Sequence, residues 1–386
     1  MSEPQLWGYP RPDGDIGIRN HVAIVAAMDN ANPTVRRVAA AVRGAVAVTC
    51  SFGRALMGED LELHERTLIG LGTNPNVYGA VVVSLEPLSA KTIADGIART
   101  GRPVRWFSLV DSGGTVRTTE LATREAVEMA AQAGKLRRVP LPWSKLVLGL
   151  ECGGSDGSSG IVSNPATGMV SDMVVDLGGT TIMCEPMEVL GGEHLLARRA
   201  KDEVVARRLI EKVQFCATYA REHGIDVLGA NPAPDNIAGG LSTIEEKALG
   251  AIHKGGSRTL NEVVDYGVRP KERGFTFMDA PAPGVENLTA LAAGGTHLAI
   301  FSTGKGNTVG NPVSPTIKVS GNPVTVVKLR DNIDVDLSAV ITEGMPLEKA
   351  ARVLFDEVVA VCNGKLTKAE LLGEVEISIS RLLRTL

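Results

Sequence analysis

The chain has 386 residues, of which 44% are hydrophobic, 22% are charged and only 4% are aromatic. This composition is that of a globular protein with a large core, and it excludes a largely disordered chain. The 40 basic and 44 acidic residues give a formal net charge of −4 and form no run of like charge. A nucleic-acid or membrane-surface partner is therefore not expected. We expect a small-molecule ligand.

Cysteine usage and the N-terminus indicate the compartment. The five cysteines are odd in number, scattered and without a CxxC pair: Cys50, Cys152, Cys184, Cys216 and Cys362. This argues against a disulfide framework and a zinc ribbon. No signal peptide opens the chain, and no segment reaches the roughly 18 apolar residues of a membrane span. We expect a cytoplasmic protein.

Short apolar runs alternate with longer amphipathic segments from residue 21 onward. Strands are expected at 22–28, 45–49, 79–85, 103–109 and 145–150, and helices at 33–42, 59–71, 89–100 and 116–136. This alternation predicts an α/β protein with two Rossmann-like, open, mostly parallel sheets flanked by helices.

The segment RRVPLPWSK at 137–145 has two prolines and neither a helical nor a strand pattern. It predicts a boundary between an N-terminal α/β domain (1–140) and a C-terminal α/β domain (141–386), although it could equally be one long loop within a sheet. Long Gly/Pro/Asn-rich connections are expected at 151–168, 229–242, 279–287 and 302–323. Connections of this length inside a compact domain are usually functional.

The most informative segment is the glycine-rich ECGGSDGSSG at 151–160, which follows an apolar strand and precedes a predicted helix at 164–175. Backbone N–H groups gathered at such a turn attract carboxylates or phosphates. The loop also carries thiol, hydroxyl and acidic groups, although it could be a plain Gly/Ser connector. No Walker pattern occurs, and GKGNTVG at 304–310 runs into NPVSP instead of a helix, so ATP and NAD are not expected.

A second cluster, CEPMEVLGGEH at 184–194, follows the apolar run TTIM. Its Cys184, Glu185, Glu188, Glu193 and His194 could ligate a divalent metal or form an acid–base pair. The spacing fits no stock zinc signature, and an acidic helix start is the alternative.

Two further loops follow the same pattern. In NPAPDNIAGGLSTIEEK (231–247), Ser242 and Glu245 are expected to form a capping box, and the backbone amides of Gly239 and Gly240 with Lys247 form a plausible carboxylate clamp. In FSTGKGNTVGNP (301–312), Lys305 and Asn307 follow an apolar strand. Ligands gather at the carboxyl ends of strands in open α/β sheets.

Several of these segments together resemble one family. GYPRPDGDIGIRNHV, ECGGSDGSSGIVSNPATG, CEPMEVLGGEHLLARRA, NPAPDNIAGGLSTIEEKALGAIHKGG and FSTGKGNTVGNPVSPTIKVSGNP are similar to the altronate and galactarate dehydratase family, in order and over nearly the whole chain. Within it, AMDNAN and SFGRALMGEDLELH resemble more closely the large subunit of sulfolactate sulfo-lyase, whereas ECGGSDGSSG resembles more closely the sugar-acid dehydratases.

The resemblance implies a lyase that eliminates water from a sugar acid such as altronate or galactarate, giving a 2-keto-3-deoxy acid. The alternatives are a sulfolactate sulfo-lyase large subunit, which releases sulfite, and a non-catalytic organic-acid-binding protein. It also implies a divalent metal, with Fe²⁺ as the first candidate and Mn²⁺ or Mg²⁺ as alternatives. A separate small SAF-type subunit and a homo-oligomer are implied as well. The His…GlyCys and CysGlu elements of the family's first domain are absent, since this chain reads CSFGR at 50–54 and LEP at 85–87.

For such a reaction we expect α-proton abstraction and stabilisation of the developing enediolate by a metal or by aimed amides. The expected catalytic residues are Glu185, Glu188, His194 and Cys152, and the expected metal ligands are Cys152, Glu185 and His194. The expected substrate-binding residues are Gly153, Gly154, Ser155, Asp156, Asn236, Gly239, Gly240, Lys247, Lys305, Asn307, Arg19 and Arg54.

Overall fold

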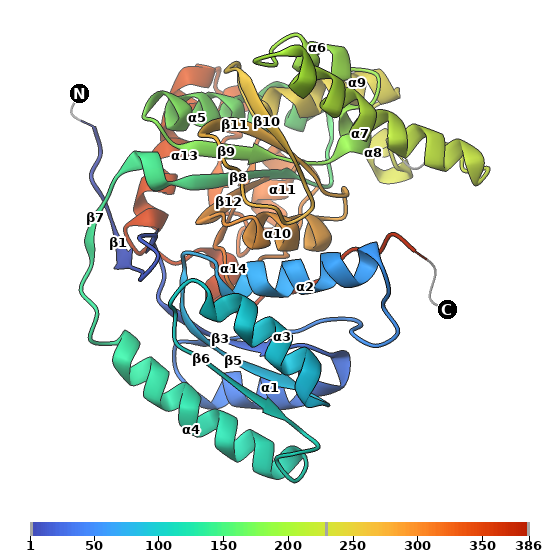
Figure 1. Ribbon diagram of the computed structural model, residues 1–386. Coiled ribbons are helices and arrows are strands. Elements are labelled where there is room, and N and C mark those ends of the chain that lie inside the picture. Colours follow the sequence, from blue (N-terminus) through green and yellow to red (C-terminus); the bar gives the residue numbers. More distant parts are fainter. Residues whose placement is uncertain (1–2, 228–230, 384–386) are drawn as a thin grey trace.

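The computed structural model describes residues 3–227 and 231–383. Two α/β bodies lie one above the other (Figure 1). The first is a four-stranded parallel sheet in the order β4-β3-β5-β6. Its strands are β3 (His21–Ala26), β4 (Ala45–Val48), β5 (Val77–Ser84) and β6 (Val104–Ser108), and its helices are α1 (Asn32–Ala41), α2 (Glu59–Gly72), α3 (Pro87–Ala98) and α4 (Thr115–Ala133), with a short η1 (Asp29–Ala31).

The second body contains a seven-stranded parallel sheet in the order β10-β11-β9-β8-β12-β13-β14. Its strands are β8 (Val147–Cys152), β9 (Thr180–Met183), β10 (Leu260–Asp265), β11 (Gly274–Asp279), β12 (Leu298–Ser302), β13 (Thr316–Ser320) and β14 (Val335–Asp336). Its longer helices are α5 (Asn164–Asp176), α7 (Glu203–Glu222), α9 (Ile244–Ile252), α10 (Gly284–Ala293) and α13 (Leu347–Cys362). The prediction of two parallel sheets flanked by helices is confirmed.

Shorter elements complete this body. They are η3, a π turn (Ser159–Ser163), η4 (Pro186–Val189), η5 (His253–Gly255), α6 (Glu193–Ala197), α8 (Pro234–Ala238), α11 (Pro323–Lys328), α12 (Ala339–Thr342) and α14 (Lys368–Leu372). The central strands are buried on both faces, as expected when helices cover both sides of a parallel sheet. On one face α5 packs against α13, and on the other α10 lies between the sheet and α2 of the first body.

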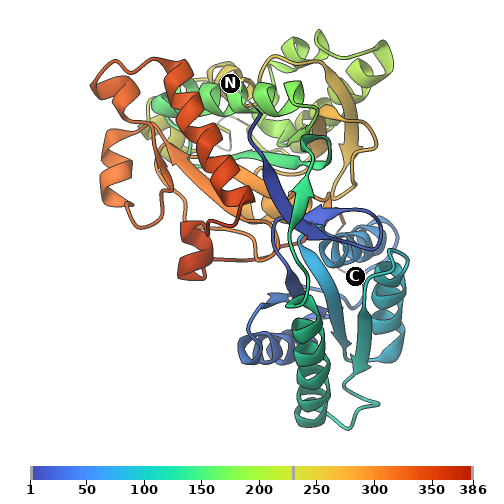
Figure 2. The same cartoon turned by 90° about the vertical axis from the view of Figure 1, so that its left-hand side faces the viewer.

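The segment predicted to lack regular structure, 137–145, instead contains β7 (Val139–Leu141) and η2 (Trp143–Lys145). β7 pairs with β1 (Leu6–Pro10), which also pairs with β2 (Ile16–Gly17). Figure 2 shows this small antiparallel sheet beside the passage between the two bodies. The boundary at residue 140 stays a prediction, because strands from both sides of it share one sheet.

Three expected connections are shorter than predicted. α5 begins at Asn164, α10 begins at Gly284, and β13 lies inside 302–323. Within 229–242, residues 229 and 230 lie outside the described residues, and α8 occupies part of the rest. The cap of α9 is one residue later than expected, since Thr243 caps the helix and Ser242 hydrogen-bonds the carboxylate of Glu246, not Glu245.

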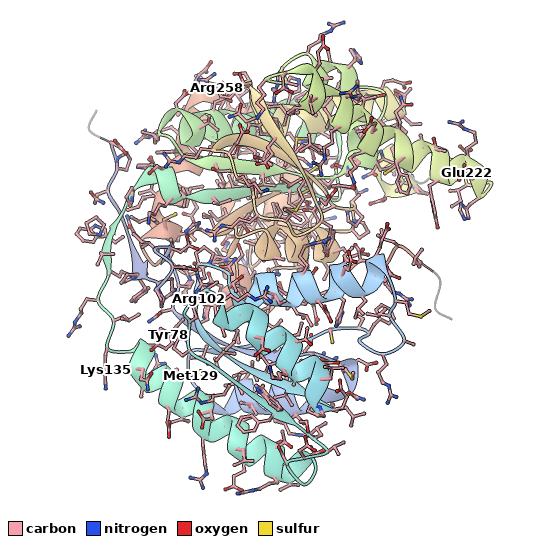
Figure 3. All side chains as sticks on the ribbon, viewed as in Figure 1. Tyr78, Arg102, Met129, Lys135, Glu222 and Arg258 are labelled. Carbon is pink, nitrogen blue, oxygen red and sulfur yellow. The ribbon has the colours of Figure 1, made fainter. Side chains whose placement is uncertain are left out.

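The outer end of the molecule is the C-terminal half of α7, which extends away from the sheet. Glu222, its last residue, lies at the outer edge (Figure 3). Among the described residues, no helix combines the length and apolarity that crossing a membrane requires.

The two bodies are joined by a buried ion pair. The Nε of Arg19 lies 2.7 Å from Oε1 of Glu370, and its other nitrogens donate to Glu370 Oε2 and to the carbonyls of Val361 and Lys365. Arg19 is only 7% exposed. The predicted substrate contact by Arg19 therefore has no support in the structure, because its donors are used to hold the C-terminal segment against the first body.

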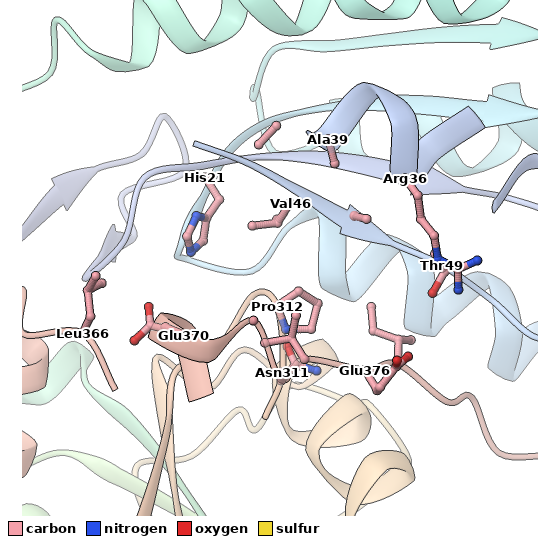
Figure 4. A pocket seen from close by; sticks show the side chains of 15 residues that line it. His21, Arg36, Ala39, Val46, Thr49, Asn311, Pro312, Leu366, Glu370 and Glu376 are labelled. Atoms are coloured by element: carbon pink, nitrogen blue, oxygen red, sulfur yellow. The ribbon is translucent and has the colours of Figure 1, made fainter. Parts of the chain in front are cut away.

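Beside this pair lies a cavity of about 430 Å³ between β4 and the C-terminal segment (Figure 4). His21 and Glu370 lie on opposite sides of it. Most of its lining is apolar, so it separates the bodies without offering a converging set of catalytic groups.

We expect Arg19→Ala to lower the free energy of unfolding by about 3 kcal/mol, because it leaves Glu370 buried without its partner. Burial alone would raise the pKa of Glu370, but the hydrogen bond and charge of Arg19 hold it below its ordinary value. A lowered carboxyl pKa contributes stability above the unfolded-state pKa and loses it as the pH falls. The deficit should therefore be full at neutral pH and shrink below about pH 4.

Urea unfolding at several pH values measures this difference. Lys91→Ala, which removes an exposed ion pair to Asp95, is the control and should change stability by less than about 0.5 kcal/mol. An Arg19→Ala deficit as small as that of the control would contradict a joining role for the pair.

Candidate functional site

The site begins at the carboxyl edge of the large sheet, where two neighbouring strands end. β8 ends at Cys152, and β9 is followed by Glu185 and Glu188 of the η4 turn. Because the strands are parallel and adjacent, their following residues meet. The Sγ of Cys152 lies 2.9 Å from Oε2 of Glu188 and 3.8 Å from Oε2 of Glu185.

Glu185 has a left-handed backbone, with φ of 76°, which is rare for a residue other than glycine. Its N–H donates to the carbonyl of Ala280 at 3.0 Å, and its own carbonyl accepts from the N–H of Glu188 at 2.9 Å. The side chain is fully buried, and its Oε1 has no hydrogen-bond partner. Unusual backbone conformations of this kind collect at functional sites.

Lys254 completes the cluster. Its fully buried Nζ donates to Sγ of Cys152 at 3.0 Å, forms an ion pair with Glu185, and lies 3.6 Å from Oε2 of Glu188.

The η5 turn that carries Lys254 packs closely against the sheet. A Cβ at Gly255 would lie 2.7 Å from the ring of Phe275, so only glycine lets the η5 turn approach the sheet this closely.

A second lysine extends the cluster toward solvent. Lys247 on α9 lies 3.0 Å from Oε1 of Glu188, and it also hydrogen-bonds Asn231 and, at 3.3 Å, Asn236. Asn236 in turn donates to the backbone carbonyl of Ser155 at 2.9 Å. The segment 231–247 is thus tied to the glycine-rich loop.

The charges in the cluster balance. Burial raises the pKa of Cys152 to about 12, with the nearby Glu188 carboxylate acting in the same direction. Burial also raises the pKa of Glu151 well above its ordinary value, so burial disfavours the charged form of both groups. The carboxylates of Glu185 and Glu188 then face the ammonium groups of Lys247 and Lys254.

The glycine-rich loop is fixed by the neighbouring loop after β12. Gly154, with φ of 63°, accepts hydrogen bonds from the N–H groups of Gly304 and Lys305. A Cβ at Gly304 would lie 2.1 Å from a carboxylate oxygen of Asp156. Asp156 itself accepts from Ser158, Ser159 and Asn322, so its carboxylate shapes the loop.

A cavity of about 220 Å³ lies between the glycine-rich loop and α9, and Lys247 connects its lining to the cluster. Ser155, Asp156, Asn164, Lys247 and His253 are among its lining residues. The Oδ1 of Asn164 is buried without a partner, and the π turn η3 precedes this residue. π turns are frequent at functional sites.

The structure brings some predicted site residues together and leaves others apart. Cys152, Glu185, Glu188, Lys247, Asn236, Ser155 and Asp156 belong to the cluster or its cavity, and Gly153 and Gly239 lie beside it through backbone hydrogen bonds to Ser302 and Gly157. Gly240, Lys305 and Arg54 are exposed, and the Oδ1 of Asn307 accepts from the N–H of Val309.

His194 is not part of the cluster. It lies exposed on the single-turn helix α6, which begins after Gly191 and Gly192 redirect the chain. The prediction that it ligates metal with Cys152 and Glu185 has no support in this geometry. Lys254 was missed, although a lysine ending the apolar helical run ALGAI and followed by two glycines could have indicated a closely packed, buried cation.

Three side chains of the cluster could hold a metal ion. Cys152, Glu185 and Glu188 each offer a ligand atom, and these atoms lie within 4.8 Å of one another. A thiolate with two carboxylates suits a divalent transition metal, and the unpartnered Oε1 of Glu185 fits such a role. The ammonium of Lys254 contacts the same three side chains, so it must withdraw for an ion to bind.

Comparisons with known proteins identify the family to which the chain belongs. Residues 143–385 match the model of the D-galactarate/altronate dehydratase C-terminal domain, and residues 8–134 match the second domain of D-galactarate dehydratase/altronate hydrolase. The beta subunit of (2R)-sulfolactate sulfo-lyase from Chromohalobacter salexigens is 39% identical over 97% of both chains.

Two dehydratases from Escherichia coli are also similar. Altronate dehydratase is 30% identical, over 93% of this chain and 74% of its own length. Galactarate dehydratase (L-threo-forming) is 32% identical, over 78% of this chain and 59% of its own length. These relatives are all lyases, and the chain belongs to the D-galactarate/altronate dehydratase family.

Proposed function

We propose that the protein eliminates a leaving group from the carbon next to the hydroxyl-bearing carbon of a small hydroxy acid. The observation that carries this proposal is the buried cluster of Lys254, Cys152, Glu185 and Glu188 beneath the glycine-rich loop. An elimination needs a base, a cation facing the developing enediolate, and shelter from water. The cluster offers all three at the edge of the sheet where ligands of α/β proteins bind.

The cavity between the glycine-rich loop and α9 is suited to a small acid. Its volume of about 220 Å³ is on the scale of a few carbon atoms with their polar groups. Lys247 supplies a positive charge there, and the unpartnered Oδ1 of Asn164 can accept a hydrogen bond from a substrate hydroxyl. The substrate carboxylate would lie near Lys247, with its α-carbon toward Glu188.

In this arrangement Glu188 is the base. Its carboxylate lies between the ammonium of Lys247 and the thiol of Cys152, which hold it in place for the α-proton. Lys254 faces the negative charge that develops and can donate a proton to a departing hydroxide. Departing sulfite needs no proton, so the same residues could serve either leaving group.

The divalent metal also remains a proposal, with Fe²⁺ as the first candidate. Cys152, Glu185 and Glu188 would hold it in place of the Lys254 ammonium, so the metal is an alternative to the arrangement in which Glu188 is the base. When bound, such an ion supplies a Lewis acid that stabilises enediolate charge.

Identity favours sulfite as the leaving group, because the sulfo-lyase beta subunit is 39% identical to this chain, whereas the two altronate dehydratases are 30% and 29% identical. Because that relative is named as a subunit, we also propose a separate small partner subunit. Water elimination from a sugar acid is the second candidate, because ECGGSDGSSG resembles the dehydratases.

Incubation with (2R)-sulfolactate should release sulfite, measured with a thiol-exchange dye. Altronate and galactarate form the parallel panel, in which a new carbonyl would reveal a 2-keto-3-deoxy acid. Both panels are run with Fe²⁺ and with a small subunit present. Failure to form either product would rule out the lyase proposal, and binding of these acids without turnover would favour an organic-acid-binding protein.

Lys254→Met should lower kcat by about 10²- to 10³-fold, because it removes a preorganised charge from the reaction centre. Lys247→Met should act mainly on KM, because that side chain contacts the substrate carboxylate in the proposed pose. Lys271→Met, at an exposed position, is the matched control. Thermal melting separates loss of activity from loss of fold, and equal kinetics for Lys254→Met and the control would refute the assignment.

Cys152→Ser should lower the iron bound per chain after anaerobic loading with Fe²⁺, because serine is a poor ligand for this ion. His194→Ala should leave the bound iron unchanged, since His194 lies outside the cluster. Elemental analysis measures both without an activity assay. Iron lost with His194→Ala but retained with Cys152→Ser would place the metal elsewhere.

A further inference from the structure

We infer that the small subunit docks on one particular surface, an inference that rests on the proposed two-subunit lyase. A cavity of about 650 Å³ lies between the two bodies on the side of α7 and α2. Phe215 and Leu382 line it, and other exposed apolar side chains neighbour its lining residues. Tyr219 lies beside Phe215, Phe52 lies against Arg381, and Met57 and Leu61 flank Glu59 in the sequence. This rim surface consists of Phe52, Met57, Leu61, Phe215, Tyr219 and Leu382.

The rim surface exposes aromatic rings, which are scarce in this chain. Phe215 is 63% exposed, Met57 57% and Tyr219 46%, in a sequence with only 4% aromatic residues. The rings of Phe215 and Tyr219 lie 6.2 Å apart on the half of α7 that extends from the body (Figure 1). Exposed apolar side chains gathered beside a cavity are typical of sites of protein association.

The rim surface is continuous with the candidate site. Pro186 and Met187 line the cavity, and they stand between Glu185 and Glu188 in the η4 turn. Asp265 and Asp279, at the carboxyl ends of β10 and β11, line it too. A chain seated on the rim would therefore close the carboxyl edge of the sheet beside the cluster.

The charged residues that line the cavity indicate which partner would fit the rim surface. Lys212 is shared between Asp265 and Asp279, at 2.8 Å from each. Glu59 and Glu62, which also line the cavity, are exposed and have no ion-pair partner within residues 3–227 and 231–383. The fitting partner presents an apolar segment flanked by basic side chains that meet the start of α2.

A separate small chain fits this surface better than a second copy does. The relative that aligns over 97% of both chains is named as one subunit of an enzyme. The altronate dehydratases carry about a quarter of their length outside the match, enough for a small domain in the same polypeptide.

The test uses the other subunit of the Chromohalobacter salexigens sulfo-lyase as the probe, mixed with the full chain without substrate. Sedimentation velocity should detect a complex at micromolar concentrations, and hydrogen exchange should show protection of residues 51–58 and 210–222. Phe215→Asp with Tyr219→Asp should weaken binding at least 100-fold. Val116→Asp, at an 86% exposed position on α4, should bind as the wild type does.

Glu59→Lys with Glu62→Lys should weaken binding at least tenfold at low salt, with a smaller effect at high salt. Matching melting temperatures confirm that the variants fold. The inference would be overturned if the wild-type chain formed no complex or if the Phe215/Tyr219 variant bound unchanged. Protection from hydrogen exchange around the cavity of Figure 4, and not at the rim surface, would overturn it too. So would a homodimer that this variant dissociates, since the surface would then bind a second copy.

These binding measurements need no turnover. A failed lyase assay with intact, variant-sensitive binding would reject the proposed function alone. An active enzyme whose subunit binds elsewhere would reject the docking surface alone.

Discussion

Two buried ammonium groups facing two buried carboxylates are the constraint on which the rest of the site depends. Removing each ion from water costs several kcal/mol, and this is offset only when every charge meets an opposite charge at short range. Lys254 and Lys247 meet Glu185 and Glu188 in this way. The backbone around them must therefore be placed precisely, which explains a left-handed Glu185.

The same constraint explains why glycine is required at two positions near the cluster. Gly255 lets the η5 turn approach Phe275, and Gly304 leaves room for the carboxylate of Asp156. Glu151 lies at the centre of this packing with both carboxylate oxygens buried and unpartnered. Unsatisfied buried groups are uncommon in folded proteins and need a reason. Here burial raises the pKa of Glu151, which disfavours a third buried negative charge in the network.

Local patterns in the sequence predict the site residues that lie at the ends of strands, but not those that lie elsewhere. Cys152 and Glu185 each follow an apolar strand, and adjacent parallel strands bring them together. His194 shares a segment with Glu185, but one redirecting turn at Gly191 and Gly192 takes it to the surface. Lys254 lies 102 residues from Cys152 in the sequence, and no local periodicity reports a contact of that range.

The described side chains of the cluster all come from the second body, since Cys152, Glu185, Glu188, Lys247 and Lys254 follow residue 146. The first-body segments 50–54 and 85–87 contribute no ligand atom to it. The first body instead supplies one wall of the cavity beside the η4 turn, through α2. Differences between family members in this body should therefore affect access to the cluster through that cavity. They should affect the chemistry of the cluster itself less.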